Sequence, residues 1–130
     1  MGTHALIIGK DKAGKYRYGQ THYDGYNNLN WLQTNMFDVN KVEEFLFYLT
    51  EGGDDNEGHG ISSLGYKTYW KNDKIIIEEN KPIISWSKYS YNCGISDSLS
   101  NIINMVRSGQ FDHPCYVSYW DGEKWENIEI

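Results

Sequence analysis

The sequence has little cysteine and no long hydrophobic run, and each shortage excludes a class of protein. No apolar run approaches the roughly 18 residues that a membrane-spanning helix needs, so we expect no membrane segment. Residues 1–8 lack the long apolar stretch of a signal peptide, which favours a cytoplasmic location. Cys93 and Cys115 are the two cysteines, and we expect free thiols, because they are too few for a zinc site.

Basic residues are also scarce. The chain has 12 Lys and Arg against 18 Asp and Glu, which gives a formal net charge of −6. Non-specific binding of nucleic acid depends on dense Lys and Arg. We therefore expect neither DNA nor a membrane surface as a partner. A basic protein partner stays open, as does a small ligand in a pocket whose local potential differs from the net charge.

Aromatic residues are abundant instead, at 15% of the chain, with 11 Tyr but only 4 Phe. Tyr presents an apolar ring and a polar hydroxyl, which suits binding surfaces. The alternative is that a small β-rich domain uses tyrosines as ordinary strand residues. The length of 130 residues fits a single domain over residues 1–130, large enough to bury a core without disulfides or metals.

Alternating side chains and turn residues predict the strands. Residues 3–9 and 15–21 are expected to form a hairpin around a turn at 10–14, where Gly14 supplies a positive φ. Pro82 is expected to begin an edge strand. A final hairpin turns at Asp121-Gly122. The remaining strands are expected at 66–70, 74–78 and 83–89.

Two helices are expected, so the fold class is α+β with a mostly antiparallel sheet and two helices. The first covers 37–52, capped by Asp38 or by Asn40 with Glu43 as a capping box. The second begins at 96–98 and ends at Gly109. Residues 27–36 are expected to be a loop or a short irregular helix.

The segment His22-Tyr23-Asp24-Gly25-Tyr26 gathers an imidazole, a carboxylate and two phenols at the end of a strand. Hairpin pairing places His4 near positions 20–21, beside His22, and strand alternation puts Tyr16, Tyr18, Gln20 and His22 on one face. Loops held by a rigid scaffold carry much of protein function. The candidate ligand-binding residues are His4, Tyr16, Tyr18, His22, Asp24 and Tyr26.

Several segments together carry a family resemblance: residues 1–4, the His22 to Tyr26 motif, residues 61–65 and the ending 116–125. The chain resembles a group of small uncharacterised proteins of bacteriophages and prophages, which begin Met-Gly-Thr-Arg and carry His-Trp/Tyr-Asp-Gly-Tyr-Pro. His4 stands where that family has Arg, and Asn27 where it has Pro. If the family's Arg binds an anion, this chain binds it more weakly or with altered specificity.

Three functions follow, with binding favoured over catalysis and with no cofactor, metal ligand or catalytic residue assigned. The first is a phage-type accessory protein that antagonises host defence by sequestering a small anionic, nucleotide-like signal. The second is an acidic inhibitor of a host defence protein such as a CRISPR nuclease, docking through Asp54, Asp55 and Glu57. The third is a small phosphodiesterase or nuclease that uses His22 and Asp24. Aromatic strands also make a homodimer possible.

Overall fold

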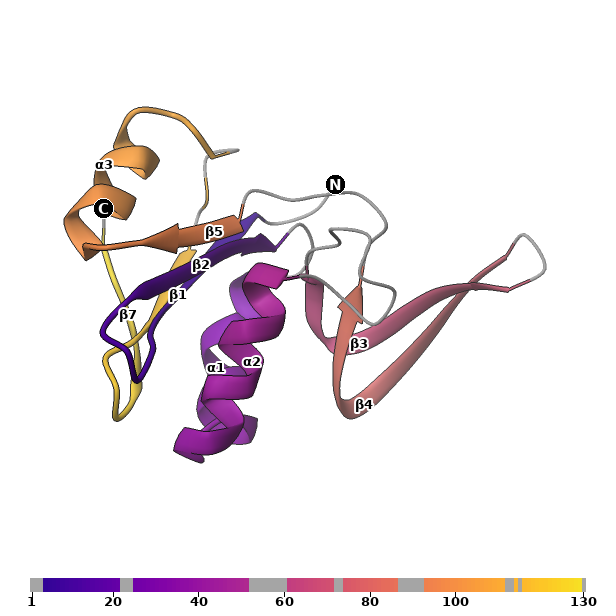
Figure 1. Ribbon diagram of the computed structural model, residues 1–130. Helices are drawn as coiled ribbons and strands as arrows, with labels where there is room; N and C mark the ends of the chain where they lie inside the picture. Colours follow the sequence, from indigo (N-terminus) through magenta and orange to yellow (C-terminus); the bar gives the residue numbers. More distant parts are fainter. Residues whose placement is uncertain are drawn as a thin grey trace.

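A five-stranded sheet lies between two helical layers (Figure 1). The computed structural model describes residues 4–21, 25–51, 61–71, 74–86, 93–111, 114 and 116–129. The strand order in the sheet is β5-β2-β1-β6-β7. Its strands are β1 (Ala5–Lys10), β2 (Tyr16–Thr21), β5 (Cys93–Ser96), β6 (Tyr116–Trp120) and β7 (Trp125–Asn127).

The class α+β is confirmed, but the expected number of helices is wrong. Three α-helices are described, preceded by the short 3-10 helix η1 (Gly25–Asn27). They are α1 (Asn28–Asn35), α2 (Val39–Glu51) and α3 (Leu99–Arg107). The extra helix, α1, forms because Trp31 and Leu32 are buried in the core, so packing stabilises a weakly patterned segment. No helix in these ranges has the length and apolar character that crossing a membrane requires.

The sheet is mostly antiparallel, as expected, with one parallel pairing between β1 and β6. The predicted first hairpin is confirmed: Ala5 pairs with Thr21 and Lys10 with Tyr16. Gly14 has a φ of +81°, which a three-residue hairpin loop requires and which few other residues adopt. β1 is the central strand.

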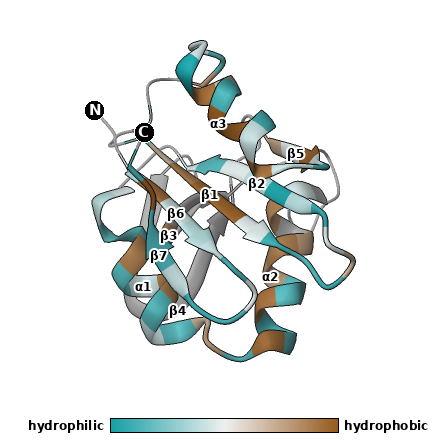
Figure 2. Cartoon of the chain, turned by 90° about the vertical axis from the view of Figure 1, so that its left-hand side faces the viewer, coloured by the Kyte–Doolittle hydropathy of each residue, from teal (hydrophilic) through white to brown (hydrophobic). Residues whose placement is uncertain are grey.

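Alternation along β1 divides the interior into two cores, and its apolar run is visible in Figure 2. Ile7 packs toward α1 and α2, while Leu6 and Ile8 pack toward α3. The core under α1 and α2 consists of Ile7, Trp31, Leu32, Val42, Phe45, Leu46, Leu49, Leu64, Trp120 and Trp125. The core under α3 consists of Leu6, Ile8, Ile102, Phe111 and Val117. β1 is thus buried on both faces, and the helices on each side of the sheet pack against it.

Asp38 caps α2, as one of the two predictions stated. Its Oδ1 accepts hydrogen bonds from the backbone N–H groups of Asn40 at 2.9 Å and Lys41 at 3.3 Å. The alternative capping box of Asn40 with Glu43 is wrong. Both side chains instead accept hydrogen bonds from Lys12 in the first hairpin turn. Lys12 Nζ donates to Asn40 Oδ1 at 2.8 Å, and Lys12 N donates to Glu43 Oε1 at 3.1 Å. The turn is therefore attached to α2.

Both ends of α3 have well-defined caps. Ser98 Oγ accepts from Asn101 N at 3.1 Å at the start of the helix. At its end Gly109 has a φ of +82°, and Gln110 N donates to Met105 O at 3.1 Å. This six-to-one hydrogen bond is the signature of a Schellman motif. It turns the chain back over the sheet and places Phe111 in the core.

The middle of the chain forms two long strands rather than the three expected. They are β3 (Ile61–Lys71) and β4 (Lys74–Trp86), a separate antiparallel ribbon. β4 continues through Pro82 because the ladder is interrupted there: Leu64 pairs with Ile84, but Tyr66 already pairs with Glu79. Proline lacks an N–H and is tolerated at such bulges. The predicted residues 87–89 lie outside the described ranges.

Candidate functional site

On the α3 side of the sheet, a row of aromatic and polar side chains runs along β2. Tyr16 and Tyr18 are half-buried against the α3 core, and the next residue on the same face is Gln20. Gln20 Nε2 lies 3.3 Å from His4 Nδ1. The predicted register, which placed His4 beside residues 20–21, is therefore confirmed. Three of the six candidate ligand-binding residues share this face.

The other three candidates lie elsewhere or outside the description. His22 and Asp24 fall outside the described ranges, and the catalytic interpretation depends on both of them. Tyr26 lies on η1, which leads into α1 on the opposite side of the sheet, and its side chain is 60% exposed. Next to it Asn28 is fully buried, and its Nδ2 donates to Thr21 Oγ1 at 3.0 Å. Among the described residues, Asn28 Oδ1 has no hydrogen-bond partner.

A hollow of about 220 Å³ lies beside Tyr18, between the β2–β5 edge of the sheet and the end of α3. Tyr18 and Phe111 meet edge to face, with ring centroids 5.7 Å apart and planes at 83°. The hollow is lined by Tyr18, Cys93, Met105, Gln110 and Phe111. The lining thus combines two aromatic residues with a methionine and a glutamine, a composition suited to an aromatic ring.

Gly94 makes room for the Tyr18 side chain on the neighbouring strand. The two residues pair across the β2–β5 ladder. A Cβ at position 94 would stand 2.7 Å from Tyr18 Oη and 3.0 Å from its Cζ, so any larger residue there displaces the phenol. The absence of a side chain at Gly94 therefore sets the shape of the hollow.

The electrostatics of the hollow favour an uncharged occupant. Burial raises the pKa of Tyr18, and the nearby Cys93 thiol adds to that rise, so the phenol stays protonated at neutral pH. Met105 lies in the last turn of α3, and Gln110 follows the helix after the turn at Gly109. The carbonyl groups at a helix C-terminus carry partial negative charge. The hollow therefore lies beside the electronegative end of a helix, which disfavours an anion.

A second tyrosine pair stands farther along the same face. Tyr119 on β6 is hydrogen-bonded to Tyr16, and burial together with Tyr16 raises the pKa of Tyr119 to about 12. Asp121 and Glu126 add to the rise by charge repulsion of the phenolate. Tyr16 thus has a partner within the sheet. It lies two residues along β2 from Tyr18, on the same face.

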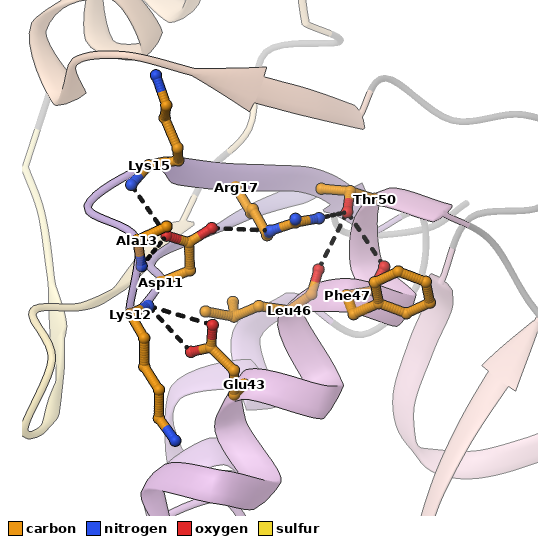
Figure 3. A network of polar contacts seen from close by, with 9 residues as sticks. All are labelled: Asp11, Lys12, Ala13, Lys15, Arg17, Glu43, Leu46, Phe47 and Thr50. Carbon is orange, nitrogen blue, oxygen red and sulfur yellow. Dashed lines mark hydrogen bonds and ion pairs between the residues drawn. The ribbon is translucent and has the colours of Figure 1, made fainter.

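Arg17, which neighbours Tyr16 and Tyr18 on β2, lies on the other face of the sheet (Figure 3). Its Nε is 3.1 Å from Asp11 Oδ2, and one terminal nitrogen donates to Thr50 Oγ1 on α2 at 2.6 Å. Asp11 also accepts from the backbone N–H groups of Ala13 and Lys15, each at 2.9 Å. This network joins the hairpin turn to α2. It leaves the guanidinium engaged in structure rather than aimed at the tyrosine-bearing face.

Lys15, the basic residue that precedes β2, is paired with Asp97, which lies just before α3. The Asp97 carboxylate raises the pKa of Lys15, and Lys15 lowers the pKa of Asp97. Both side chains are well exposed. Neither Lys15 nor Arg17 therefore contributes positive charge to the hollow.

Sequence reasoning identified Tyr18 but missed the rest of the hollow's lining. Met105, Gln110 and Phe111 come from a helix end more than eighty residues away, and Gly109 was interpreted only as a helix stop. Gly109 was the one signal in the sequence that could have indicated this lining. A glycine at a helix end favours a Schellman turn, which brings the following residues back against the helix. Within the described ranges, no three His, Cys, Asp or Glu side chains form a cluster that could hold a metal ion.

Comparisons of the chain with family models, with curated proteins and with solved structures found no match. The phage resemblance and the functions that it implies therefore stay predictions. The hollow and its surroundings carry the functional argument by their own geometry.

Proposed function

We propose that the protein is a non-enzymatic binding protein that receives the ring of a small ligand in the hollow beside Tyr18. The observation that supports this is the hollow itself, which two aromatic residues and Gln110 help to line. Small-molecule sites are concave, mostly apolar and supplied with a few placed polar groups.

The size of the hollow limits the ligand to one ring or one nucleobase. Pockets that enclose whole ligands measure about 300–1,000 Å³, and this one measures about 220 Å³. The electrostatic potential limits the ligand further. Arg17 and Lys15 are engaged elsewhere, and the hollow lies at the electronegative end of α3. The expected nucleotide-like signal is thus better represented by its base and sugar than by its phosphates.

The biological setting of this proposal comes from the phage resemblance. A phage-type accessory protein that sequesters a nucleotide-like signal in the host cytoplasm would antagonise host defence without catalysis. That setting needs a ligand, so binding is the first thing to measure.

Calorimetry with matched pairs of ligands tests the proposal. Each nucleoside is compared with its monophosphate and with cyclic and ADP-ribose-type nucleotides. We expect the nucleoside to bind at least as tightly as its phosphorylated form. Phe111→Leu should weaken binding about tenfold, since it removes one aromatic contact. Tyr26→Ala, on the other side of the sheet, is the matched control. A folded protein that binds none of these ligands refutes the proposal.

A second candidate function, inhibition of a host protein by docking, is favoured by the exposed apolar side chains around α2. Phe37, Val39 and Phe47 are 71%, 44% and 51% exposed. Val39, Glu43 and Phe47 follow one another at four-residue spacing and so share a stripe of the helix. The acidic residues first proposed for this role, Asp54, Asp55 and Glu57, lie outside the described ranges. Pull-down of a host partner should be lost in Phe47→Lys and kept in Glu44→Lys.

A further inference from the structure

The five-stranded sheet ends in two strands whose outer edges are protected to different degrees. β5 lies at one end of the strand order and β7 at the other (Figure 2). The outer edge of an end strand presents backbone N–H and C=O groups to its surroundings, and proteins block such edges with charges, prolines or a covering helix. An edge without these devices is a place where another strand can pair.

β7 carries several of these devices. It has only three residues, and Glu126 in its middle is charged and exposed. α1 contacts this strand, and Gln33 Nε2 donates to the carbonyl oxygen of Trp125 at 3.1 Å, so a side chain satisfies a backbone group there. We therefore expect that β7 does not accept a further strand.

The sequence of β5 offers no such protection. Its four residues, Cys93-Gly94-Ile95-Ser96, include no charge and no proline. Within the described part of the chain, β2 is the one strand that pairs with β5. In an antiparallel ladder, every second residue points its N–H and C=O away from its partner. The outer edge of β5 therefore holds backbone groups in position for an extended segment.

Alternation gives β5 two different faces. On the α3 side the side chain of Tyr18 reaches over Gly94, where a Cβ would stand 2.7 Å from Tyr18 Oη. On the α2 side Ile95 is 49% exposed, although isoleucine is among the residues most often buried. Ile95 pairs with Arg17, which donates to Thr50 Oγ1 on α2 (Figure 3). The exposed isoleucine thus lies where the edge strand meets α2.

Phe47 extends this apolar surface onto the helix. Its side chain is 51% exposed, and its carbonyl oxygen accepts from Thr50 Oγ1 at 3.1 Å. Phe47 and Ile95 therefore border the contact between Arg17 and Thr50 from the helix and from the strand. A strand added to β5 would place every second side chain on this face. An apolar side chain there would be removed from water together with Ile95.

We propose that the outer edge of β5 accepts an extended segment of a basic partner protein, which adds a strand to the sheet and covers Ile95 with an apolar side chain. In this mode of recognition, main-chain hydrogen bonds supply affinity and alternate side chains supply specificity. The net charge of −6 attracts a segment that carries Lys or Arg at its ends. The site is the edge of the sheet, so the proposal stands whether or not a nucleoside binds in the hollow beside Tyr18.

A second copy of the chain is a less suitable occupant of this edge. The four residues of β5 span about 13 Å, whereas a stable dimer buries about 1,600 Å² in total. Two chains that each carry a charge of −6 also repel each other. A short basic segment meets neither obstacle.

Fluorescence anisotropy of labelled peptides with the full-length chain tests the proposal. Each probe is an octapeptide with Lys at both ends and with Thr alternating with one apolar residue, which is Val, Ile, Phe or Tyr in the four probes. At least one probe should bind, with a dissociation constant in the micromolar range. A folded chain that binds none of the four overturns the proposal. So does a chain that forms a dimer in sedimentation through this edge, because the occupant is then a second copy.

Variants on the two end strands form a matched pair. Ile95→Lys charges the edge of β5 and should weaken peptide binding at least tenfold. Asn127→Lys places the same charge on β7 and should leave binding unchanged, and equal losses in the two variants contradict the proposal. Circular dichroism shows whether each variant is folded. If Ile95→Lys fails to fold, Ile95→Thr keeps a β-branched side chain and should still weaken binding several-fold.

A further variant separates the edge from the hollow. Phe111→Leu alters the lining of the hollow and should leave peptide binding unchanged. A peptide that loses affinity in Phe111→Leu but not in Ile95→Lys binds in the hollow, which overturns the assignment to the edge.

Backbone pairing is tested with N-methylated peptides. A methyl group on nitrogen removes a hydrogen-bond donor, and alternate N–H groups of a strand point to opposite edges. Methylation of one alternate set should abolish binding, whereas methylation of the other set should preserve it. Amide hydrogen exchange should slow within residues 93–96 when the peptide binds and stay unchanged within residues 125–127. Equal effects of the two methylated sets, or unchanged exchange within residues 93–96, would show that no strand has been added.

Discussion

The two faces of the five-stranded sheet differ in how closely a helix approaches them. On the α2 side, Gly19 lets Leu49 come so near that a Cβ would stand 2.6 Å from its Cδ1. On the α3 side, the adjacent position on β2 is Tyr18, whose side chain packs against the α3 core and lines the hollow. Small residues thus close one interface and tyrosines hold the other open. The tight packing on the α2 side, the closed face, contributes to stability. The α3 side, the open face, is where a ligand could enter.

The largest effect on stability is expected on the α2 side of the sheet, at Asp11. Its side chain attaches the hairpin turn to that closed face. Asp11→Ala removes the partner of Arg17 and two backbone acceptor bonds at once. Breaking a buried ion pair costs about 3–5 kcal/mol, and we expect the lower end because the Arg17 side chain is 20% exposed. Urea denaturation measures the loss. Lys15→Met, which breaks only an exposed pair, should leave the midpoint unchanged, and an equal loss in both would contradict this account.

A smaller effect is expected from two glycines on opposite faces. Gly19→Ala forces a methyl group against Leu49, including its backbone oxygen at 3.2 Å, and should destabilise the fold by about 1–3 kcal/mol. Gly94→Ala meets only the far end of the Tyr18 side chain, which can rotate away. It should cost less than about 1 kcal/mol yet alter ligand binding in the hollow. Thermal denaturation and calorimetry on both variants separate the outcomes, and a Gly94→Ala protein with unchanged binding would place the ligand elsewhere.

Strand and helix patterns were sufficient to predict most of the fold. The first hairpin, α2, α3 and the final hairpin follow from local signals such as Gly14, Asp38 and Ser98. Local signals leave the segment of α1 open between a loop and a short irregular helix, because it is rich in Asn and is stabilised by the burial of Trp31 and Leu32. The ribbon was divided wrongly at Pro82, since the bulge that accommodates the proline depends on the partner strand.

The candidate site was less predictable than the fold. Alternation placed Tyr16, Tyr18 and Gln20 on one face, and pairing brought His4 to Gln20. The sequence could not show that Arg17 would find Asp11 and Thr50, because Thr50 is 33 residues away along the chain. It also could not join Tyr18 to Phe111, since that contact depends on the α3 turn. Periodicity predicts faces, but long-range packing decides what lies on them.

The pH dependence of stability tests the packing on the open face. The pKa of Tyr119 is raised to about 12 from the usual 10, chiefly by burial, so the folded state favours the neutral phenol. Between pH 10 and pH 12 the unfolded chain loses this proton while the folded chain retains it, and stability falls as the pH rises through that window. Tyr119→Phe removes this contribution, so its melting temperature should fall less over the same window than that of the wild type. Tyr116→Phe, at an exposed position on the same strand, is the control and should follow the wild type. Equal alkaline losses in all three proteins would mean that Tyr119 is more hydrated than its packing against Tyr16 implies, and that the open face extends across β6.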